Sequence, residues 1–436
     1  TNRKVLASRI KTYIGASEVT LANDANNRVA TATGSGGLNG EANLTFSGTV
    51  LTVPDGSPSA PSITSSTATA DSGIAFLAAD TVSVVSAGKE QIRFGSTPIP
   101  GGSKNLVING GMTASQRPAQ AITASAYTAV DMWQIYLASS AGRLTATQDS
   151  TTGAAAPLGH GFSVKLDCTT AEGSLAAGDV ITLRHSIEAQ SLQHLQWGAA
   201  SAKAVTLSFW MSSPKSGTHC VALNQPDSSE RHYIAEFTVA SADTWEHFKI
   251  TIPGDSSGTI DNNTGAGLSI NFPLVCGSTY QNTGDTWAAG ADYGTSSVQN
   301  LLDNTSNDVY FAGVQLEVGS VGTDFAHEDA GTTLRKCLRY YERITGDVSS
   351  QIVGVGVCRS TTNCSQIPFS YAVKRAIPTL TVNSVSAYDI ISSSAGGVAT
   401  TNLTAQQLST RSVALAATVA SGLTDGRPGA LDMDSA

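Results

Sequence analysis

The chain has 436 residues, of which 41% are hydrophobic and only 14% are charged, and its net charge is -9. This is enough apolar material for roughly two to four domains with true cores, which excludes a disordered chain. The acidic balance argues against nucleic acid or an anionic membrane as a partner, because both attract basic surfaces. Without a long apolar run or a signal-peptide core, we expect cytoplasmic synthesis and no membrane insertion.

The first hundred residues are predicted to form an arm followed by a shaft. Residues 1–33 are polar and weakly amphipathic, which suggests an attachment arm. Residues 34–100 carry short alternating strands, such as Leu44–Phe46 and Val50–Val53, separated by Gly-rich and Pro-Asp-Gly turns. Strands this short bury too little apolar surface for a core of their own. We therefore expect several identical chains to wind together into an intertwined β shaft.

The next region, residues 101–328, reads as a compact domain made of strands. Apolar side chains alternate with polar ones in several stretches that end at turns. These stretches include 162–168, 206–211, 247–252 and 268–272. Many such strands over more than two hundred residues predict an antiparallel sandwich of the jelly-roll type.

A change of period marks residues 309–344. Up to Val318 the side chains alternate as in a half-buried strand, whereas beyond the following turn apolar residues recur at helical spacing. The predicted helix face consists of Leu334, Cys337, Leu338 and Tyr341. We expect this helix to cover an edge or face of the sandwich. Gln315 and Glu317 then meet polar partners at a boundary, or they form an ordinary solvated face.

The remaining chain, residues 329–436, is predicted to hold this helix and a C-terminal β region. Strands are expected at 352–357, 368–373 and 378–382, followed by a polar tail rich in Thr and Ser. The fold class is therefore mainly β, with a shaft, a jelly-roll sandwich with one helix, and a C-terminal β region.

Four segments taken together resemble a family of bacteriophage tail-fibre and tail proteins. They are "NLVINGGMTASQR" at 105–117, "DMW" at 131–133, "WEHFKITIPGD" at 245–255 and "AGVQLEVGSVGTDFAHEDAGTTLRKCLRYYE" at 312–342. The family pattern is roughly NLLxNGxFxxxQR, DRW, WxxxTxTIPGD and QLExGxxxTxFExxxxxxExxxCxRYYE. The chain departs from it at Met132, where the family has Arg, and at Thr333, where it often has an acid.

This resemblance implies a virion protein that is made in the host bacterial cytoplasm. It also implies a homotrimer, with residues 1–33 attached to other virion proteins and a jelly-roll head presented to host-surface carbohydrate. A non-adhesive scaffold, such as a head or collar fibre or a decoration protein, is the alternative. A glycan depolymerase is the least favoured class, because such enzymes are usually built on a long parallel β-helix.

No catalytic motif is found in the sequence. The seven histidines form no HExxH or HxH pattern, and GxSxG and P-loop motifs are absent. We expect no enzyme activity, no metal and no cofactor. The six cysteines form no CxxC pattern, so reduced buried thiols are favoured, although Cys358 and Cys364 are close enough in sequence to leave a pair open.

The most suggestive binding surface is a loop at residues 276–298, where aromatic residues stand among Gly, Asn, Asp and Thr. The candidate glycan-binding residues are Tyr280, Asn282, Asp285, Trp287 and Tyr293. Aromatic faces stack on the C–H groups of sugars, while amides and carboxylates bind hydroxyls. The alternative for Trp287 is that it packs the loop onto the sandwich.

Overall fold

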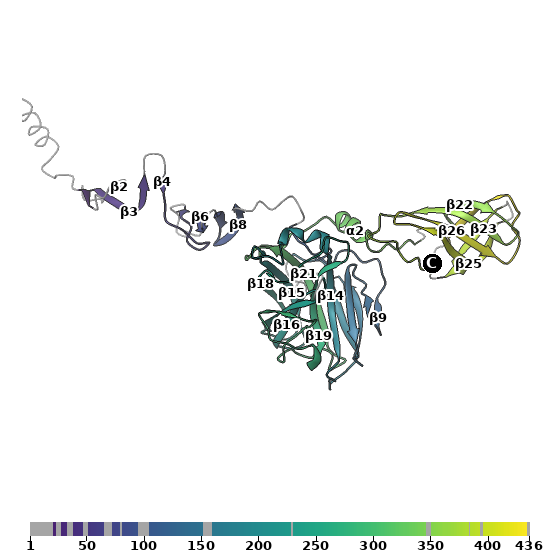
Figure 1. Ribbon diagram of the computed structural model, residues 1–436, viewed down its shortest axis with the longest axis horizontal. Helices are drawn as coiled ribbons and strands as arrows, with labels where there is room; N and C mark the ends of the chain where they lie inside the picture. Colours follow the sequence, from purple (N-terminus) through teal and green to yellow (C-terminus); the bar gives the residue numbers. More distant parts are fainter. Residues whose placement is uncertain are drawn as a thin grey trace, which may run out of the picture. The chain divides into compact units, whose positions relative to one another are not determined.

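The computed structural model separates the chain into two compact units, Thr1–Gly102 and Ser103–Ala436 (Figure 1). The residues that it describes are 21–22, 28–32, 38–46, 51–64, 72–78, 81–94, 104–150, 159–227, 230–345, 350–382, 384–392 and 396–433. Most of the predicted arm, residues 1–20 and 23–27, therefore lies outside the described residues. No helix in the described ranges has the length and hydropathy needed to cross a bilayer.

The first unit contains two small sheets whose strands find their hydrogen-bond partners within the chain. One sheet comprises β1 (Leu21–Ala22), β2 (Arg28–Ala32), β3 (Leu38–Phe46) and β4 (Leu51–Thr52), and the other comprises β5 (Ile63–Thr64), β6 (Gly73–Ala78), β7 (Thr81–Ser86) and β8 (Lys89–Phe94). Leu51, Ile63, Ile74 and Val84 stay exposed. Intertwining of chains stays a prediction, but these apolar side chains are uncovered in a single chain.

In the second unit, two antiparallel sheets face each other and form the jelly-roll sandwich (Figure 1). One is a seven-stranded sheet ordered β10 (Ala126–Tyr127), β11 (Trp133–Ala138), β14 (Val180–Glu188), β19 (Ala266–Cys276), β16 (Gly217–Gln225), β17 (Arg231–Val239) and β20 (Trp287–Ala289). The other is a six-stranded sheet ordered β18 (Trp245–Ile252), β15 (Val205–Ser212), β21 (Asp308–Val318), β13 (Ser163–Thr170), β12 (Arg143–Asp149) and β9 (Gln120–Ile122). The predicted jelly-roll sandwich is thereby confirmed.

The core between the sheets is built from the inward side chains of alternating strand positions. Its centre is a group of phenylalanines, in which the Phe272 ring lies 4.9 Å from Phe209 and 4.6 Å from Phe311, measured between centroids. Short 3-10 turns connect or follow the strands of this unit: η2 (Ala189–Ser191), η3 (Gln193–Leu195), η4 (Ser278–Tyr280) and η5 (Val385–Ala387).

Gln315 and Glu317 are buried, so the solvated face that was one expectation for them is wrong. Gln315 Nε2 donates to Glu317 Oε1 at 3.0 Å, and its Oε1 accepts from the Ala326 backbone N–H at 2.8 Å. Glu317 also accepts from the backbone N–H and the hydroxyl of Thr323. The two side chains thus fold the segment after β21 back onto its own strand.

The helix α2 (Ala330–Leu338) begins at Asp329, whose side chain accepts from the Thr332 backbone N–H. Of its predicted face, Cys337 is buried and Leu338 and Tyr341 are half-buried, but Leu334 is exposed, and Thr333, which was not predicted on this face, is buried. Beyond the helix end, Arg339 and Tyr340 both donate to the carboxylate of Glu188, at distances of 2.6 to 3.0 Å, and this attaches the end of the helix to β14.

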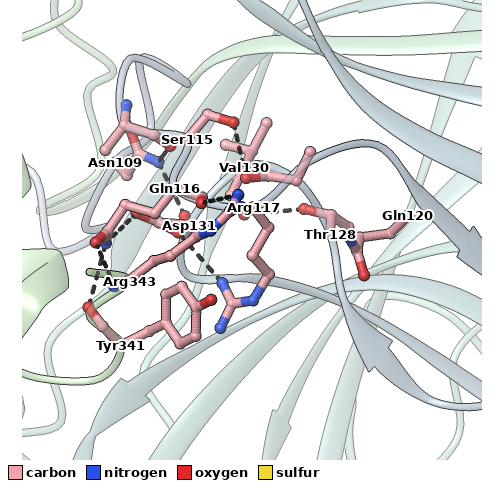
Figure 2. A network of polar contacts seen from close by, with 12 residues as sticks. Asn109, Ser115, Gln116, Arg117, Gln120, Thr128, Val130, Asp131, Tyr341 and Arg343 are labelled. Atoms are coloured by element: carbon pink, nitrogen blue, oxygen red, sulfur yellow. Dashed lines mark hydrogen bonds and ion pairs between the residues drawn. The ribbon is translucent and has the colours of Figure 1, made fainter. Parts of the chain in front are cut away.

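A polar network joins the segment entering the sandwich to the segment leaving α2 (Figure 2). The buried carboxylate of Asp131 accepts from Gln116 Nε2 at 2.7 Å and from Arg117 Nη1 at 3.2 Å. The Arg117 guanidinium lies 3.4 Å from the centroid of the Tyr341 ring. Gln116 also binds the Tyr341 carbonyl and the Arg343 backbone N–H. Three of the four segments that carry the family resemblance therefore meet at one structural joint.

The C-terminal β region is a closed six-stranded barrel. Its strands, in order around the barrel, are β22 (Gln351–Cys358), β23 (Asn363–Ser370), β26 (Ser412–Val419), β25 (Gly397–Leu408), β24 (Tyr388–Ile391) and β27 (Pro428–Met433). The strand predicted at 378–382 is absent from this described segment, and the predicted polar tail instead supplies β25, β26 and β27. In β25 most side chains point out to solvent, which explains why its sequence resembles a tail.

Candidate functional site on the outer face of the seven-stranded sheet

The outer face of the seven-stranded sheet carries a row of polar side chains across β11, β14, β19 and β16. Alternation explains it, since Ile181, Leu183, His185 and Ile187 of β14 are turned to the core side, whereas Thr182, Arg184 and Ser186 point outward. We call this surface the polar face and define it as Gln134, Tyr136, Thr182, Arg184, Ser186, Asn224, Ser269 and Asn271.

Side-chain hydrogen bonds connect neighbouring strands across the polar face. Asn271 is fully buried, and its Oδ1 accepts from Thr182 Oγ1 at 3.1 Å and from Arg184 Nε at 2.7 Å. Its Nδ2 donates to Asn224 Oδ1 at 2.9 Å. The amide is thus satisfied on both sides, so the polar face is a fixed scaffold rather than a set of independent surface groups.

Arg184 lies half-buried within this scaffold. Its Nη2 donates to the hydroxyl of Tyr293 at 3.1 Å, and its guanidinium carbon lies 4.2 Å from the centroid of the Tyr136 ring. Contacts on three sides hold the guanidinium in one orientation. A partly exposed tyrosine and a positioned cation therefore stand side by side on this face.

The predicted loop brings two of its aromatic residues to the same place. The Tyr293 ring lies 5.7 Å from Tyr280 and 5.9 Å from Tyr136, measured between centroids. Tyr293 is almost fully buried, and burial raises the pKa of its hydroxyl to about 12, so it stays neutral under all ordinary conditions. Tyr280 is half-buried and extends the aromatic surface beside the polar face.

The other predicted site residues do not all lie beside Tyr136 and Tyr293, because Trp287 lies at the far edge of the sheet. Asn282 is exposed, and its Nδ2 donates to Asp292 Oδ2 at 2.8 Å near the tyrosines. Asp285 is also exposed, but its backbone N–H binds the Ile234 carbonyl. Trp287 lies on β20 at the opposite edge of the sheet. The loop therefore does not gather the five predicted residues into one site.

Trp287 is half-buried against the sandwich. Its ring makes an edge contact with Trp197 at 5.1 Å and lies 5.5 Å from Tyr233, while its Nε1 donates to the Pro253 carbonyl at 2.8 Å. Trp197 and Tyr233 are themselves buried. These contacts fit the packing alternative for Trp287, and a role in glycan binding stays a prediction.

We expect Trp287→Ala to lower the free energy of unfolding by about 3 kcal/mol, because it removes ring contacts and leaves a cavity beside Trp197. Chemical denaturation measures this, and Thr286→Ala, a change at the exposed neighbour, should stay within about 0.5 kcal/mol of the parent. A Trp287→Ala protein with parental stability but lost glycan binding would instead place this side chain in the ligand site.

Sequence reasoning missed Tyr136 and Arg184. Their signal was present in the alternation of residues 133–138 and 180–188, which points both side chains away from the core. What the sequence alone does not reveal is that β11 and β14 are neighbours, and that Tyr293 reaches them from more than a hundred residues away.

The polar face and the tyrosines beside it carry aromatic rings, amides, hydroxyls and one guanidinium, groups that are able to stack and to form hydrogen bonds. Within the part of the chain that the structure describes, no three His, Cys, Asp or Glu side chains gather as a metal site.

No protein-family model matches the sequence, and no curated protein matches it. Among solved structures, the chain is similar to the enzymatically active domain of tailspike protein 4 of bacteriophage CBA120, at 10% identity and a TM-score of 0.28, over 49% of this chain and 21% of that one. It is similar to a CBM4 structure at 15% identity and a TM-score of 0.26, over 48% and 99% of the two chains.

A third similar structure is the family 11 carbohydrate-binding module from Clostridium thermocellum in complex with a mixed-linked tetrasaccharide. The identity is 13% and the TM-score 0.24, over 48% of this chain and all of that one. Similarities at this level assign neither a ligand nor a family to the chain.

Proposed function

We propose that this chain is a structural fibre protein of a bacteriophage virion that binds host-surface glycans through the polar face of its sandwich. The observation that carries the binding proposal is the Tyr136 ring with the Arg184 guanidinium held against it, on a sheet face of satisfied amides and hydroxyls. The motif resemblance in residues 105–342 supports the assignment to a virion. The protein acts as an adhesin and not as an enzyme.

A glycan fits this chemistry better than a nucleic acid does. A sugar ring has an apolar C–H face, which stacks on tyrosine, and a rim of hydroxyls, which bind guanidinium and amide groups. The polar face lacks the dense positive charge that a nucleic acid requires, and the chain as a whole is acidic. Only Gln134, Tyr136, Arg184 and Ser186 on this face keep part of their surface open to a ligand.

A scaffold role is the second candidate, and one observation favours it. On β22 the side chains of Ile352, Val355 and Val357 are exposed by 50%, 53% and 44%, and no charged residue interrupts that strand. An uncharged apolar strand of this kind suits a contact with another protein of the particle. In that case β22 of the barrel binds another protein of the particle, and the sandwich does not bind a host receptor.

We expect Tyr136→Ala to weaken binding of the protein to host-surface polysaccharide about tenfold, because the stacking surface is lost. Tyr310→Ala is the matched control. Tyr310 is a partly exposed tyrosine on the six-stranded sheet, 5.9 Å from Lys165 Nζ, and its loss should leave binding unchanged. Equal binding by both variants, each with parental melting temperature, would exclude the polar face as the receptor site.

The proposal includes a homotrimer, with residues 1–33 attached to other virion proteins. The exposed Leu51, Ile63, Ile74 and Val84 of the first unit support self-association, since identical chains would cover them symmetrically. Light scattering should give three times the 44.7 kDa chain mass, and deletion of residues 1–100 should weaken the trimer without unfolding the sandwich. A folded monomer at micromolar concentration would contradict the shaft interpretation.

A further inference from the structure

Cys358 and Cys364 lie directly opposite each other at the end of the β22–β23 hairpin of the barrel. Both are fully buried, and in the structure both are free thiols. Each sulfur lies less than 3 Å from the position that a Cβ on Gly429 would occupy, at 2.7 Å for Cys364 and 2.8 Å for Cys358. The two sulfurs thus share one small space that exists because residue 429 has no side chain.

The backbone hydrogen bonds show that Cys358 and Cys364 form a non-hydrogen-bonded pair, which is the antiparallel pair type with the shorter distance between Cα atoms. The Cys358 N–H donates to the Arg427 carbonyl, and the Cys358 carbonyl accepts from the Gly426 N–H, so both groups face away from β23. The hydrogen bond of the hairpin is made one position further on, from the Arg359 N–H to the Asn363 carbonyl. In an antiparallel pair without mutual hydrogen bonds the two Cα atoms lie about 4.5 Å apart, which is within the range of disulfides.

We propose that Cys358 and Cys364 are an oxidation site. An intrachain disulfide forms between them, across the hairpin, when the protein reacts with a small-molecule disulfide such as glutathione disulfide. One thiolate attacks the oxidant and forms a mixed disulfide, and the second thiolate displaces the bound half. Two protons leave the cysteines, and their two electrons reduce the oxidant to two thiols. The product is one S–S bond within the barrel.

The surroundings explain why the thiols persist until the hairpin opens. Burial, followed by its hydrogen bond with Cys358, raises the pKa of Cys364 to about 12, so the reactive thiolate is scarce in the closed barrel. Oxidation therefore proceeds during folding or local opening of the hairpin, after which the opposed sulfurs favour ring closure over other partners.

The chain contains its own comparison pair, Cys220 and Cys276. Both are buried in one cluster, as Cys358 and Cys364 are in theirs. Their strand partners are different, however, because Cys220 lies opposite Glu236 and Cys276 opposite Val180. The two pairs of cysteines are thus similarly buried. They differ in strand register, because only Cys358 and Cys364 lie directly opposite each other.

The test is to unfold the reduced full-length chain and refold it with glutathione disulfide at about pH 8, then count alkylatable thiols and map linked peptides. We expect the six thiols to fall to four, a mass loss of about 2 Da, and a link between Cys358 and Cys364. A Cys358→Ser chain treated in the same way should form no internal link. Six remaining thiols after refolding, stable glutathione adducts on either cysteine, or a link between Cys220 and Cys276 would overturn the proposal.

Discussion

Asp131→Ala should lower the free energy of unfolding by about 3 kcal/mol, because it leaves the Arg117 guanidinium, which is only 15% exposed, without its carboxylate. Asp131 is 1% exposed, and its other partner, Gln116, connects the entry segment to the chain beyond α2 (Figure 2). Burial raises the pKa of Asp131 and lowers the pKa of Arg117, so each charge is disfavoured without the other. Denaturant unfolding of the full chain measures the loss.

Lys215→Ala is the matched control, since it removes an ion pair with Asp303 in which both side chains are about a quarter to a third exposed. A pair this exposed is worth less than about 1 kcal/mol. A double variant, Arg117→Met with Asp131→Leu, should regain much of the stability, because it removes the buried carboxylate together with the guanidinium that it pairs with. If Asp131→Ala were as stable as Lys215→Ala, the joint of Figure 2 would not hold the sandwich and helix together.

Acid should destabilise the sandwich well above the pH at which carboxylates titrate, and His185 and His160 are the main reasons, because burial lowers the pKa of His185 to about 3 and that of His160 to about 4. The His185 ring is fully buried, and its Nε2 accepts from the Ile108 backbone N–H at 3.3 Å. An unfolded histidine titrates near 6.5, so below that pH the unfolded chain takes up a proton that the native ring refuses. Between pH 6.5 and 4 the His185 ring should remove about 3 kcal/mol of stability.

His185→Gln separates this effect from other acid effects, because an amide oxygen accepts from the same N–H and does not titrate. Stability measured from pH 7 to pH 4 should fall less steeply in this variant than in the parent. His247→Gln removes an exposed ring and should leave most of the slope in place. Identical slopes for His185→Gln and the parent would mean that His185 is not the group that takes up the proton.

The strands of the sandwich were predictable because each signal is local. Residues 205–212 and 245–252 alternate clearly, and they form the neighbouring strands β15 and β18. The barrel was only half predicted, since β25 exposes Thr and Gln side chains and its closure depends on β24 and β26. The predicted face of α2 fails at Leu334, which is exposed, and the contact of Arg339 with Glu188, a residue some 150 positions earlier, has no local signal in the sequence.

In the candidate site, too, the residues with a local signal were predictable and those brought together by distant strands were not. Tyr280 and Tyr293 lie in a loop whose composition is unusual in itself, so the sequence pointed to them. Tyr136 and Arg184 come from separate strands and have no unusual neighbours in sequence. Their contact arises from the pairing of β11 with β14, in which Tyr136 lies opposite Thr182. The sequence of one strand does not predict which distant strand pairs with it.

The most direct test of glycan binding by the polar face is a structure of the full chain with a bound oligosaccharide prepared from the surface polysaccharide of a host bacterium. We predict that a sugar ring lies against Tyr136, with one of its hydroxyls or an acidic substituent in contact with the Arg184 guanidinium. A sugar bound at Trp287 or on the barrel, with the polar face empty, would contradict this account.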